Sequence, residues 1–405
     1  MNWFQKLGPG IMFAGAAIGV SHLVQSTRAG ADFGFGLIWA LLLINVIKYP
    51  FFAFGVHYTS RTNEDLLTAF SKMGRWVLVV YFMLTLCTMF TFQTAVTIVT
   101  AGIATSITGI GTPLIWAGFI LLTCFLILLR GRFSILNKIM KYVVLALTLT
   151  TIMTLIFAWM NTTTPPSWVQ VIPSTTLGVS FLIAFMGWMP APLDLAIWQS
   201  LWAVEKKKLT PNVSARQVTW DFNIGYATTI VIGLSFILLG GIVMFGQGQE
   251  FSINGTIFAN QLINMYTDSL GPWSRLFIGL AALTTMFSTS LSTLDGSPRV
   301  MAKTSQLLFS PRYQISYTTW LVILVIGSVL IYLGLTDQMG TLITIGTVLS
   351  FISAPFYAIV IYNLVTGPSL SQEEQPGPWI KRLSLAAIVA LMGFSLWYLI
   401  TLWGF

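Results

Sequence analysis

Charged residues are scarce in this chain of 405 residues. Asp, Glu, Lys and Arg make up only 8% of the sequence, whereas hydrophobic residues make up 56%. A soluble domain carries about 25% charged residues, so this composition excludes an ordinary soluble protein. The sequence therefore predicts a polytopic membrane protein whose main partner is the lipid bilayer.

Cysteine and histidine are also rare, with two residues of each. Cys87 and Cys124 both lie in apolar stretches, where a thiol is usually a small buried side chain. We therefore expect neither a disulfide nor a cysteine metal site. The sequence contains no nucleotide-binding loop, no HExxH motif and no combination of nucleophile and base. The chain is predicted not to be an enzyme and to carry no cofactor.

Long apolar runs make up most of the chain. Each is close to the ~20 residues that an α-helix needs to cross a bilayer. Eleven such runs are present: 8–28, 35–56, 74–103, 112–129, 136–160, 178–203, 222–246, 273–292, 316–335, 340–365 and 379–404. They predict an all-α fold with one transmembrane domain over residues 1–405 and no soluble domain in the loops.

The positive charges are unevenly distributed, and the formal net charge is +8. With a cytoplasmic N-terminus, the cytoplasmic loops receive eighteen Lys and Arg residues, Lys48 included, and the opposite side receives only Arg28 and Arg275. This asymmetry obeys the positive-inside rule, so it indicates orientation and not nucleic-acid binding. We expect a multi-pass protein of the bacterial inner membrane, with its N-terminus in the cytoplasm and its C-terminus outside.

Two of the apolar runs contain helix-breaking residues. Run 8–28 has Gly19 near its middle, and run 178–203 has Pro190 and Pro192. Proline removes a backbone donor and clashes with the preceding turn, so we expect each of these runs to form two half-helices. Inside a bilayer, the freed backbone groups are tolerated only where they line a cavity within the protein.

The two broken runs stand at corresponding places in two halves of the chain. Runs one to five cover 8–160 and runs six to ten cover 178–365, which leaves 379–404 as an extra helix. Gly19 and Met189 are 170 positions apart, which agrees with a repeat of five helices. Paired broken helices indicate an inverted repeat with a binding site between them, as in secondary transporters.

The polar residues beside the two breaks form the predicted substrate site. Asp194 is interpreted as a cation ligand or proton acceptor, or as a carboxylate that only caps its half-helix. His22, next to Ser21, either binds metal and relays protons or is a buried, hydrogen-bonded histidine. Met189 offers a thioether ligand, although methionine usually fills core space. The backbone of Gly19 completes the site, and the predicted metal ligands are Asp194, His22 and Met189.

Other polar residues within the apolar runs are candidates for a coupling-ion or secondary site. Gln25 follows the first break, and Gln93 lies in run 74–103, where a hydrogen bond between helices is the simpler interpretation. Run 273–292 carries a group of hydroxyls that suit sodium but equally serve helix packing. The candidates among them are Ser288, Thr289 and Ser292.

Several short motifs follow one another along the chain. They are Gly8-Pro9-Gly10, the segment RAGADFG at 28–34, Tyr49-Pro50-Phe51-Phe52, the TNEDLL segment at 62–67, Met189-Pro190 and DFNIGY at 221–226. In this order they resemble the Nramp family of proton-coupled divalent metal transporters, over most of the chain. The resemblance implies a LeuT-like fold of 5+5 inverted repeats within eleven transmembrane helices, with substrate bound between the unwound parts of helices one and six.

The metal-binding motifs of that family are altered here. Its DPGN motif aligns with residues 19–22, so Gly19 replaces the Asp and His22 replaces the Asn. Its MPHN motif aligns with residues 189–192, which keep the methionine and lose the histidine. A divalent cation then lacks its principal anionic ligand unless Asp194 supplies it from the other half-helix.

The leading hypothesis is an Nramp-like secondary transporter that imports a divalent cation, Mn²⁺, Fe²⁺ or Mg²⁺, together with protons. The first alternative is a symporter of a small organic solute such as an amino acid, coupled to Na⁺ or H⁺, since half-helix N-termini bind carboxylates. The second alternative is a membrane protein that binds a partner and transports nothing.

Overall fold

The protein is helical wherever its structure is described. The computed structural model describes residues 8–130, 133–162, 167–209, 214–246, 252, 255–272, 274–335 and 339–402, and these residues contain no β-strand. The helices are α2 (Pro9–Ala17), η1 (Ser21–Ser26), α3 (Thr27–Phe33), α4 (Ile38–Thr62), α5 (Leu66–Met73), α6 (Arg75–Thr108), α7 (Pro113–Arg130), α8 (Phe133–Asn161), α9 (Thr176–Trp188), α10 (Leu195–Leu209), α11 (Ala215–Val243), α12 (Gly255–Leu270), α13 (Ser274–Leu308), η2 (Pro311–Tyr313), α14 (Tyr317–Leu335), α15 (Met339–Thr366) and α16 (Pro378–Leu402).

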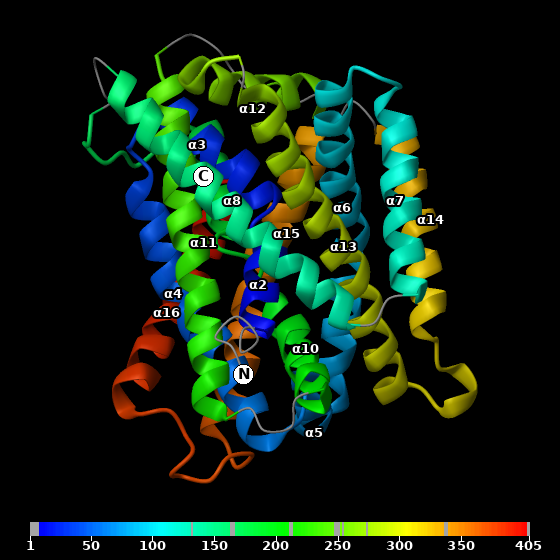
Figure 1. Ribbon diagram of the computed structural model, residues 1–405. Helices are drawn as coiled ribbons and strands as arrows, with labels where there is room; N and C mark the ends of the chain where they lie inside the picture. The colour runs from blue at the N-terminus through cyan, green and yellow to red at the C-terminus, as the bar shows by residue number, and fades with distance from the viewer. Residues whose placement is uncertain are drawn as a thin grey trace.

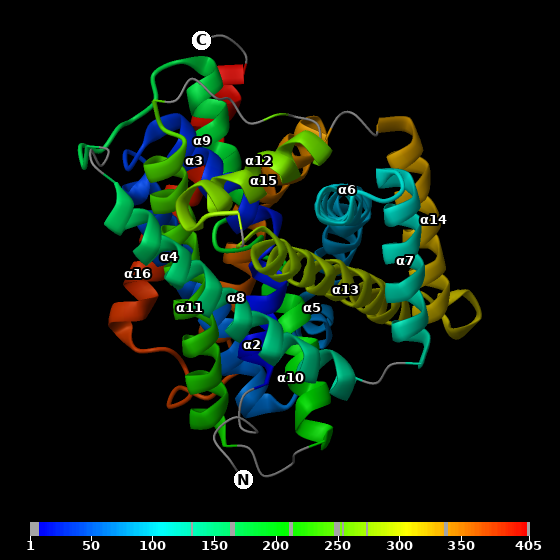
Figure 2. The same cartoon turned by 45° about the horizontal axis from the view of Figure 1, so that its top comes forward.

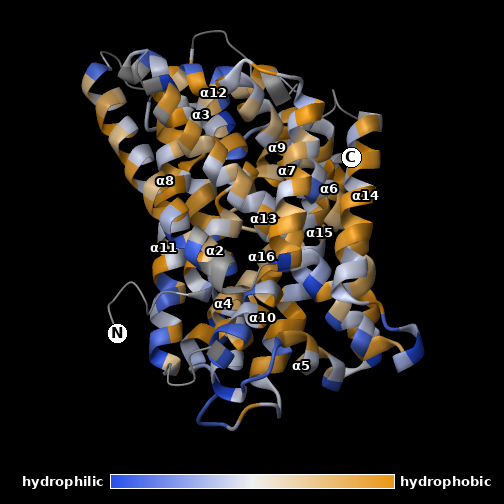
Figure 3. Cartoon of the chain, turned by 45° about the vertical axis from the view of Figure 1, so that its right-hand side comes forward, coloured by the Kyte–Doolittle hydropathy of each residue, from blue (hydrophilic) through white to orange (hydrophobic). Residues whose placement is uncertain are grey.

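Eight helical stretches in the described residues are long and apolar enough to cross a membrane. They coincide with eight of the eleven predicted runs, while run 273–292 lies within α13 and the other two runs are broken. Apolar residues cover the middle of the bundle and polar residues gather at its two ends (Figure 3). The protein is therefore a multi-pass membrane protein. The predicted positions of the chain ends fall on 1–7 and 403–405, outside the described residues.

The two broken helices run in opposite directions through the bundle. The first rises from α2 to α3, and the second descends from α9 to α10, so that α3 and α9 share one end (Figures 1 and 2). The half-helix α2 packs against α8, α10, α11 and α13 in the middle of the bundle. This antiparallel arrangement is the one expected of an inverted repeat. The bounds of the repeats, 8–160 and 178–365, stay a prediction.

The beginning of the first broken helix is held by α11. The carboxylate of Asp221 accepts hydrogen bonds from the backbone N–H of Gly8 at 2.9 Å and of Gly10 at 2.7 Å. These amides have no partner within their own helix, and a carboxylate stabilises the positive end of the helix dipole. Two of the motifs noted in the sequence, Gly8-Pro9-Gly10 and DFNIGY, are thus two sides of one contact.

Glycines allow α2 and α3 to approach α11 at backbone distance. A Cβ atom on Gly10 would overlap the carbonyl of Asp221, and one on Gly225 would overlap the carbonyl of Gly10. Nearer the other end, a Cβ on Gly30 would overlap the carbonyl of Ile237. Small residues at such crossings are the usual means of close helix packing in membranes.

We predict that Gly10→Ala and Gly225→Ala each destabilise the protein. The added methyl group has no space between the two backbones, and overpacking of this kind costs about 1–3 kcal/mol. The melting temperature of the purified protein in detergent, or its yield, measures the effect. Gly118→Ala in α7 is the control, because a Cβ there meets nothing within 4 Å. Equal melting temperatures for all three variants would show that this crossing is not tight.

Candidate functional site

The break in the first helix is short and its backbone is satisfied by hydroxyl groups. Helix α2 ends at Ala17, and after Ile18 and Gly19 the chain continues as the π-helix η1. The hydroxyl of Ser21 donates to the carbonyl of Ala17 at 2.6 Å, and that of Thr289 on α13 donates to the carbonyl of Ile18 at 3.1 Å. Neutral side chains therefore satisfy the carbonyls that the break sets free.

Gly19 stands where α13 crosses this break. A Cβ atom at this position would lie 2.6 Å from the Thr289 methyl carbon and 2.8 Å from its hydroxyl oxygen. Any side chain at this position would force the Thr289 side chain to shift and would disturb its hydrogen bond to the carbonyl of Ile18. Gly19 thus has a packing function in this chain.

The break in the second helix is longer. Helix α9 ends at Trp188, the backbone of Met189 is extended, and α10 begins at Leu195. The peptide bond between Met189 and Pro190 is cis. Asp194 directly precedes α10. The backbone N–H groups of Asp194 and Leu195 stabilise the negative charge of its carboxylate. This is the capping position at the positive end of a half-helix.

A lysine satisfies the backbone of the second break. Lys48 of α4 is completely buried, and its ammonium donates to the carbonyls of Met186 at 3.0 Å, Gly187 at 2.6 Å and Ala191 at 3.2 Å. Its assignment to a cytoplasmic loop was therefore wrong, because the side chain points inward from the transmembrane helix α4. The negative charge of Asp194 also stabilises the positive charge of this ammonium group.

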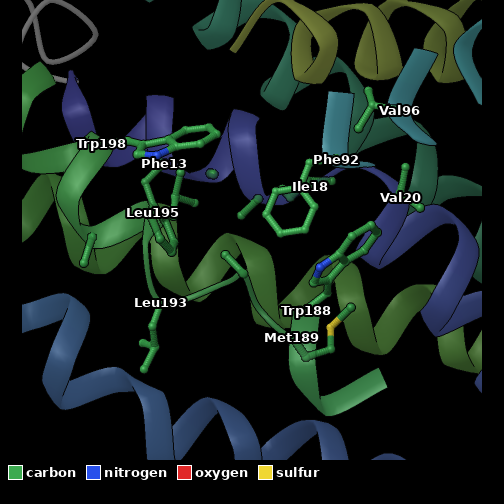
Figure 4. Close-up of a cluster of buried hydrophobic side chains, with 14 of the residues drawn as sticks. Phe13, Ile18, Val20, Phe92, Val96, Trp188, Met189, Leu193, Leu195 and Trp198 are labelled. Carbon is green, nitrogen blue, oxygen red and sulfur yellow. The ribbon is translucent and has the colours of Figure 1, made fainter. Parts of the chain in front are cut away.

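A cavity of about 60 Å³ lies between the two breaks. Much of its wall is apolar: Phe92 and Trp188 meet edge to face with ring centroids 5.4 Å apart, and they lie near Val20 and Val96 (Figure 4). The cavity is lined by Ala16, Ala17, Gly19, Val20, Ser21, Phe92, Val96, Trp188, Pro192, Asp194, Leu195, Trp198, Thr289 and Thr293. The site thus combines an aromatic wall with a few polar groups.

Most polar side chains of the cavity lining carry oxygen atoms able to accept hydrogen bonds or bind a cation. The lining also includes two indole N–H donors: that of Trp188 donates to Ser350, and that of Trp198 has no partner in the described structure. The hydroxyls of Ser21 and Thr289 donate their protons to backbone carbonyls, and that of Thr293 donates to Oε1 of Gln93. Each of these oxygens keeps a lone pair for a guest. Asp194 supplies the one charged group in the lining. An arrangement of oxygen acceptors around one carboxylate suits a positively charged guest.

Two of the three predicted metal ligands do not line this cavity. Both ring nitrogens of His22 are 3.1 Å from backbone carbonyls, Nδ1 from Ala17 and Nε2 from Thr229. The sulfur of Met189 is buried and accepts a hydrogen bond from Ser26 at 3.7 Å. In the part of the chain that the structure describes, no group of three His, Cys, Asp or Glu side chains is positioned to hold a metal ion.

The predicted secondary residues lie close to the site, and most of them serve helix packing. Gln93 of α6 accepts from Thr293 of α13, which is a hydrogen bond between helices. Ser288 and Ser292 donate to carbonyls of their own helix, so Thr289 is the one of the three predicted hydroxyls that reaches the cavity. Gln25 is buried, and its carbonyl oxygen has no partner in the described structure.

The inward position of Lys48 and the aromatic wall were missed from sequence, and Thr293 was not selected among the hydroxyls of its stretch. The signal for Lys48 was present, because it lies inside an apolar helix and an ionisable residue there indicates a functional site. Thr293 differs from its neighbouring hydroxyls only by the face of α13 on which it lies. Nothing in the sequence pattern shows which of several serines and threonines faces another helix's break.

Comparisons with known proteins agree on the type of protein. The family model described as natural resistance-associated macrophage protein-like, Nramp, matches residues 10–401. An uncharacterized protein of Pasteurella multocida (strain Pm70) is 31% identical over 405 residues, covering 98% of this chain and 92% of that protein.

Solved structures of similar fold are transporters. A mutant of the manganese transporter of Eremococcus coleocola has a TM-score of 0.74 at 16% identity, covering 98% of this chain and 87% of that one. Mhp1, a nucleobase-cation-symport-1 family transporter with bromovinylhydantoin bound, has 0.61 at 14%, covering 97% and 92%. MhsT in complex with L-phenylalanine has 0.60 at 13%, covering 97% and 98%. The fold is therefore LeuT-like, as predicted.

We predict that Thr289→Val impairs the protein although it hardly changes the shape of the side chain. The variant leaves the carbonyl of Ile18 buried without its donor, at a cost of about 1–3 kcal/mol. A lower melting temperature and slower transport are expected. Thr284→Val on the same helix is the control, since that exposed hydroxyl only binds the Leu280 carbonyl of its own helix. Equal stability of the two variants would contradict this role for Thr289.

Proposed function

Since the chain belongs to the Nramp-like family, we propose that it is a secondary transporter that carries a cation across the membrane through the cavity between its broken helices. The observation that carries this proposal is the lining of that cavity, which contains three hydroxyl groups and the carboxylate of Asp194. The described residues around the cavity offer a cation both a charge and neutral ligands, and neither a nucleophile nor a cofactor is needed for that role.

The proposed substrate is a divalent metal cation that prefers oxygen ligands. Carboxylate, hydroxyl and water oxygens suit Mg²⁺ and Mn²⁺, whereas Fe²⁺ is also well served by imidazole, and the sulfur of Met189 and the imidazole of His22 face elsewhere. The structurally similar protein of Eremococcus coleocola is a manganese transporter, which supports a divalent ion. A cavity of about 60 Å³ has room for water beside the ion, so the ion would keep part of its hydration shell there.

Import driven by protons is the proposed mode of coupling. It rests on the resemblance to the Nramp family and on the expected orientation of the chain. Asp194 would act as cation ligand at the start of α10, where its negative charge would compensate both the positive end of the half-helix and the bound cation. Ser21, Thr289 and Thr293 would complete the ligand shell.

We predict that Asp194→Asn removes most cation flux. In proteoliposomes, Mn²⁺ or Mg²⁺ uptake with an inward proton gradient is expected to fall on the order of tenfold or more, because losing a charge-assisted contact costs about 1.5–3 kcal/mol. Glu373→Gln, which neutralises an exposed carboxylate in the loop before α16, is the control and should transport normally.

Three outcomes of that experiment would overturn the proposal. Flux unchanged in Asp194→Asn would remove the carboxylate from the site. Flux unaffected by the proton gradient would remove the coupling. Cation binding without any flux in the wild-type protein would favour the membrane binding protein over the transporter.

A second candidate substrate is a small organic solute with an apolar body. The apolar wall formed by Phe92, Trp188 and Val96 favours it. The N-terminus of α10 is already occupied by the carboxylate of Asp194, so this break disfavours a solute carboxylate and favours an amine. Saturable uptake of an organic amine or amino acid, with no cation flux, would select this candidate.

The proposed orientation places the loop 109–112 outside the cell and the loop 367–377 in the cytoplasm. In a Cys87→Ser, Cys124→Ser background, Ile110→Cys should react with a membrane-impermeant thiol reagent on intact cells, since Ile110 is 72% exposed. Gln372→Cys, also on an exposed residue, should react only after the cells are permeabilised. The reverse labelling pattern would place the N-terminus outside.

A further inference from the structure

Lys48 holds a positive charge on the backbone of the second break, where the transport proposal assigns it no task. We propose that its ammonium group is a cation built into the chain, which occupies the carbonyls at the end of α9 so that no free monovalent ion binds there. This proposal goes beyond the transported substrate, because it concerns what keeps the broken helix in shape whichever guest the cavity accepts.

The geometry of the Lys48 ammonium is that of a coordinated cation. The carbonyls of Met186 and Gly187 belong to the last turn of α9, and that of Ala191 belongs to the non-helical link after it. An ammonium has three N–H donors, and here each of them has one carbonyl acceptor. The ammonium therefore connects the end of α9 to the link that follows it, as a bound ion would.

The electrostatics of the position favour a positive charge. The last carbonyls of a helix have no intrahelical partner and form the negative end of the helix dipole. A buried ammonium is tolerated only where its hydrogen bonds are satisfied and a compensating charge is near. Asp194, at the start of α10, supplies that charge from the other side of the break. The Asp194 carboxylate also interacts electrostatically with two other ionisable groups, the phenols of Tyr81 of α6 and Tyr357 of α15.

The usual occupants of such a place in transporters of this fold class are free ions. In discontinuous transmembrane helices, the backbone carbonyls of the unwound segment and of the half-helix C-terminal end coordinate the coupling ion, Na⁺ or H⁺. A lysine side chain that reaches the same kind of carbonyls makes a free ion unnecessary, and it cannot dissociate. The wild-type protein is accordingly expected to be indifferent to the choice of Na⁺, K⁺ or choline as the monovalent cation.

The test is to remove the built-in cation and to look for a free one in its place. Lys48→Ala leaves the carbonyls in place and opens a space for a small ion. Its melting temperature in detergent should be several degrees below the wild type in choline chloride. It should rise again in NaCl or in the chloride salt of propylammonium, whose chain and ammonium replace the missing part of the side chain. The wild type and Lys72→Ala, which removes an exposed lysine, should show no such dependence.

Two further variants separate charge from packing. Lys48→Met keeps a long side chain without a charge, so it should be destabilised and should not respond to Na⁺ or propylammonium. Lys48→Arg keeps the charge and should be more stable than Lys48→Met. If Lys48→Ala yields no folded protein in any salt, the proposal is tested by comparing the melting temperatures of Lys48→Met and Lys48→Arg. A Met variant as stable as the Arg variant overturns the proposal.

Other results would also overturn it. They are a Lys48→Ala variant whose melting temperature is the same in choline, NaCl and propylammonium, and a wild-type protein that depends on Na⁺ as strongly as this variant does. Because melting is measured without any flux, failure of the cation-transport assay leaves this test intact, and failure of this test leaves the transport proposal intact.

Discussion

A helix that is interrupted inside a bilayer exposes backbone carbonyls and amides that neither lipid nor water can satisfy, and each unsatisfied group costs several kcal/mol. The protein must therefore provide a partner for each of them. In this chain those partners are Ser21 beside the first break, Thr289 of α13 and Lys48 of α4. The cavity exists because these contacts hold two broken helices open beside each other.

The two breaks are satisfied by different chemistry, although their positions in the fold correspond. Hydroxyls of Ser21 and Thr289 serve the first break, and a charged ammonium serves the second. Hydroxyls that donate to carbonyls keep their oxygens available to a guest, whereas an ammonium with three acceptors has nothing left to offer. Ser21, Thr289 and Asp194 therefore present oxygen atoms to the cavity, while Lys48 supports the second break from outside the cavity lining.

Much of the fold was predictable because its causes are local. Gly19, Pro190 and Pro192 marked both breaks, since glycine and proline act on the backbone at their own position. Apolar runs gave the helices because a bilayer demands about 20 such residues. The site was less predictable. Packing between distant segments decides which face of α13 meets the break. It also decides that the ring nitrogens of His22 face the carbonyls of Ala17 and Thr229.

Asp194 and Lys48 act on the charge around the second break in opposite directions, and Gly19 adds no charge to the first. When both groups are ionised, Asp194 and Lys48 together carry no net charge. Under the proposed function, a divalent ion would meet one carboxylate and neutral oxygens, and its binding would rest largely on the water that it retains. Mg²⁺, which keeps several waters and uses one or two carboxylates, tolerates such a site better than an ion that needs a full set of protein ligands.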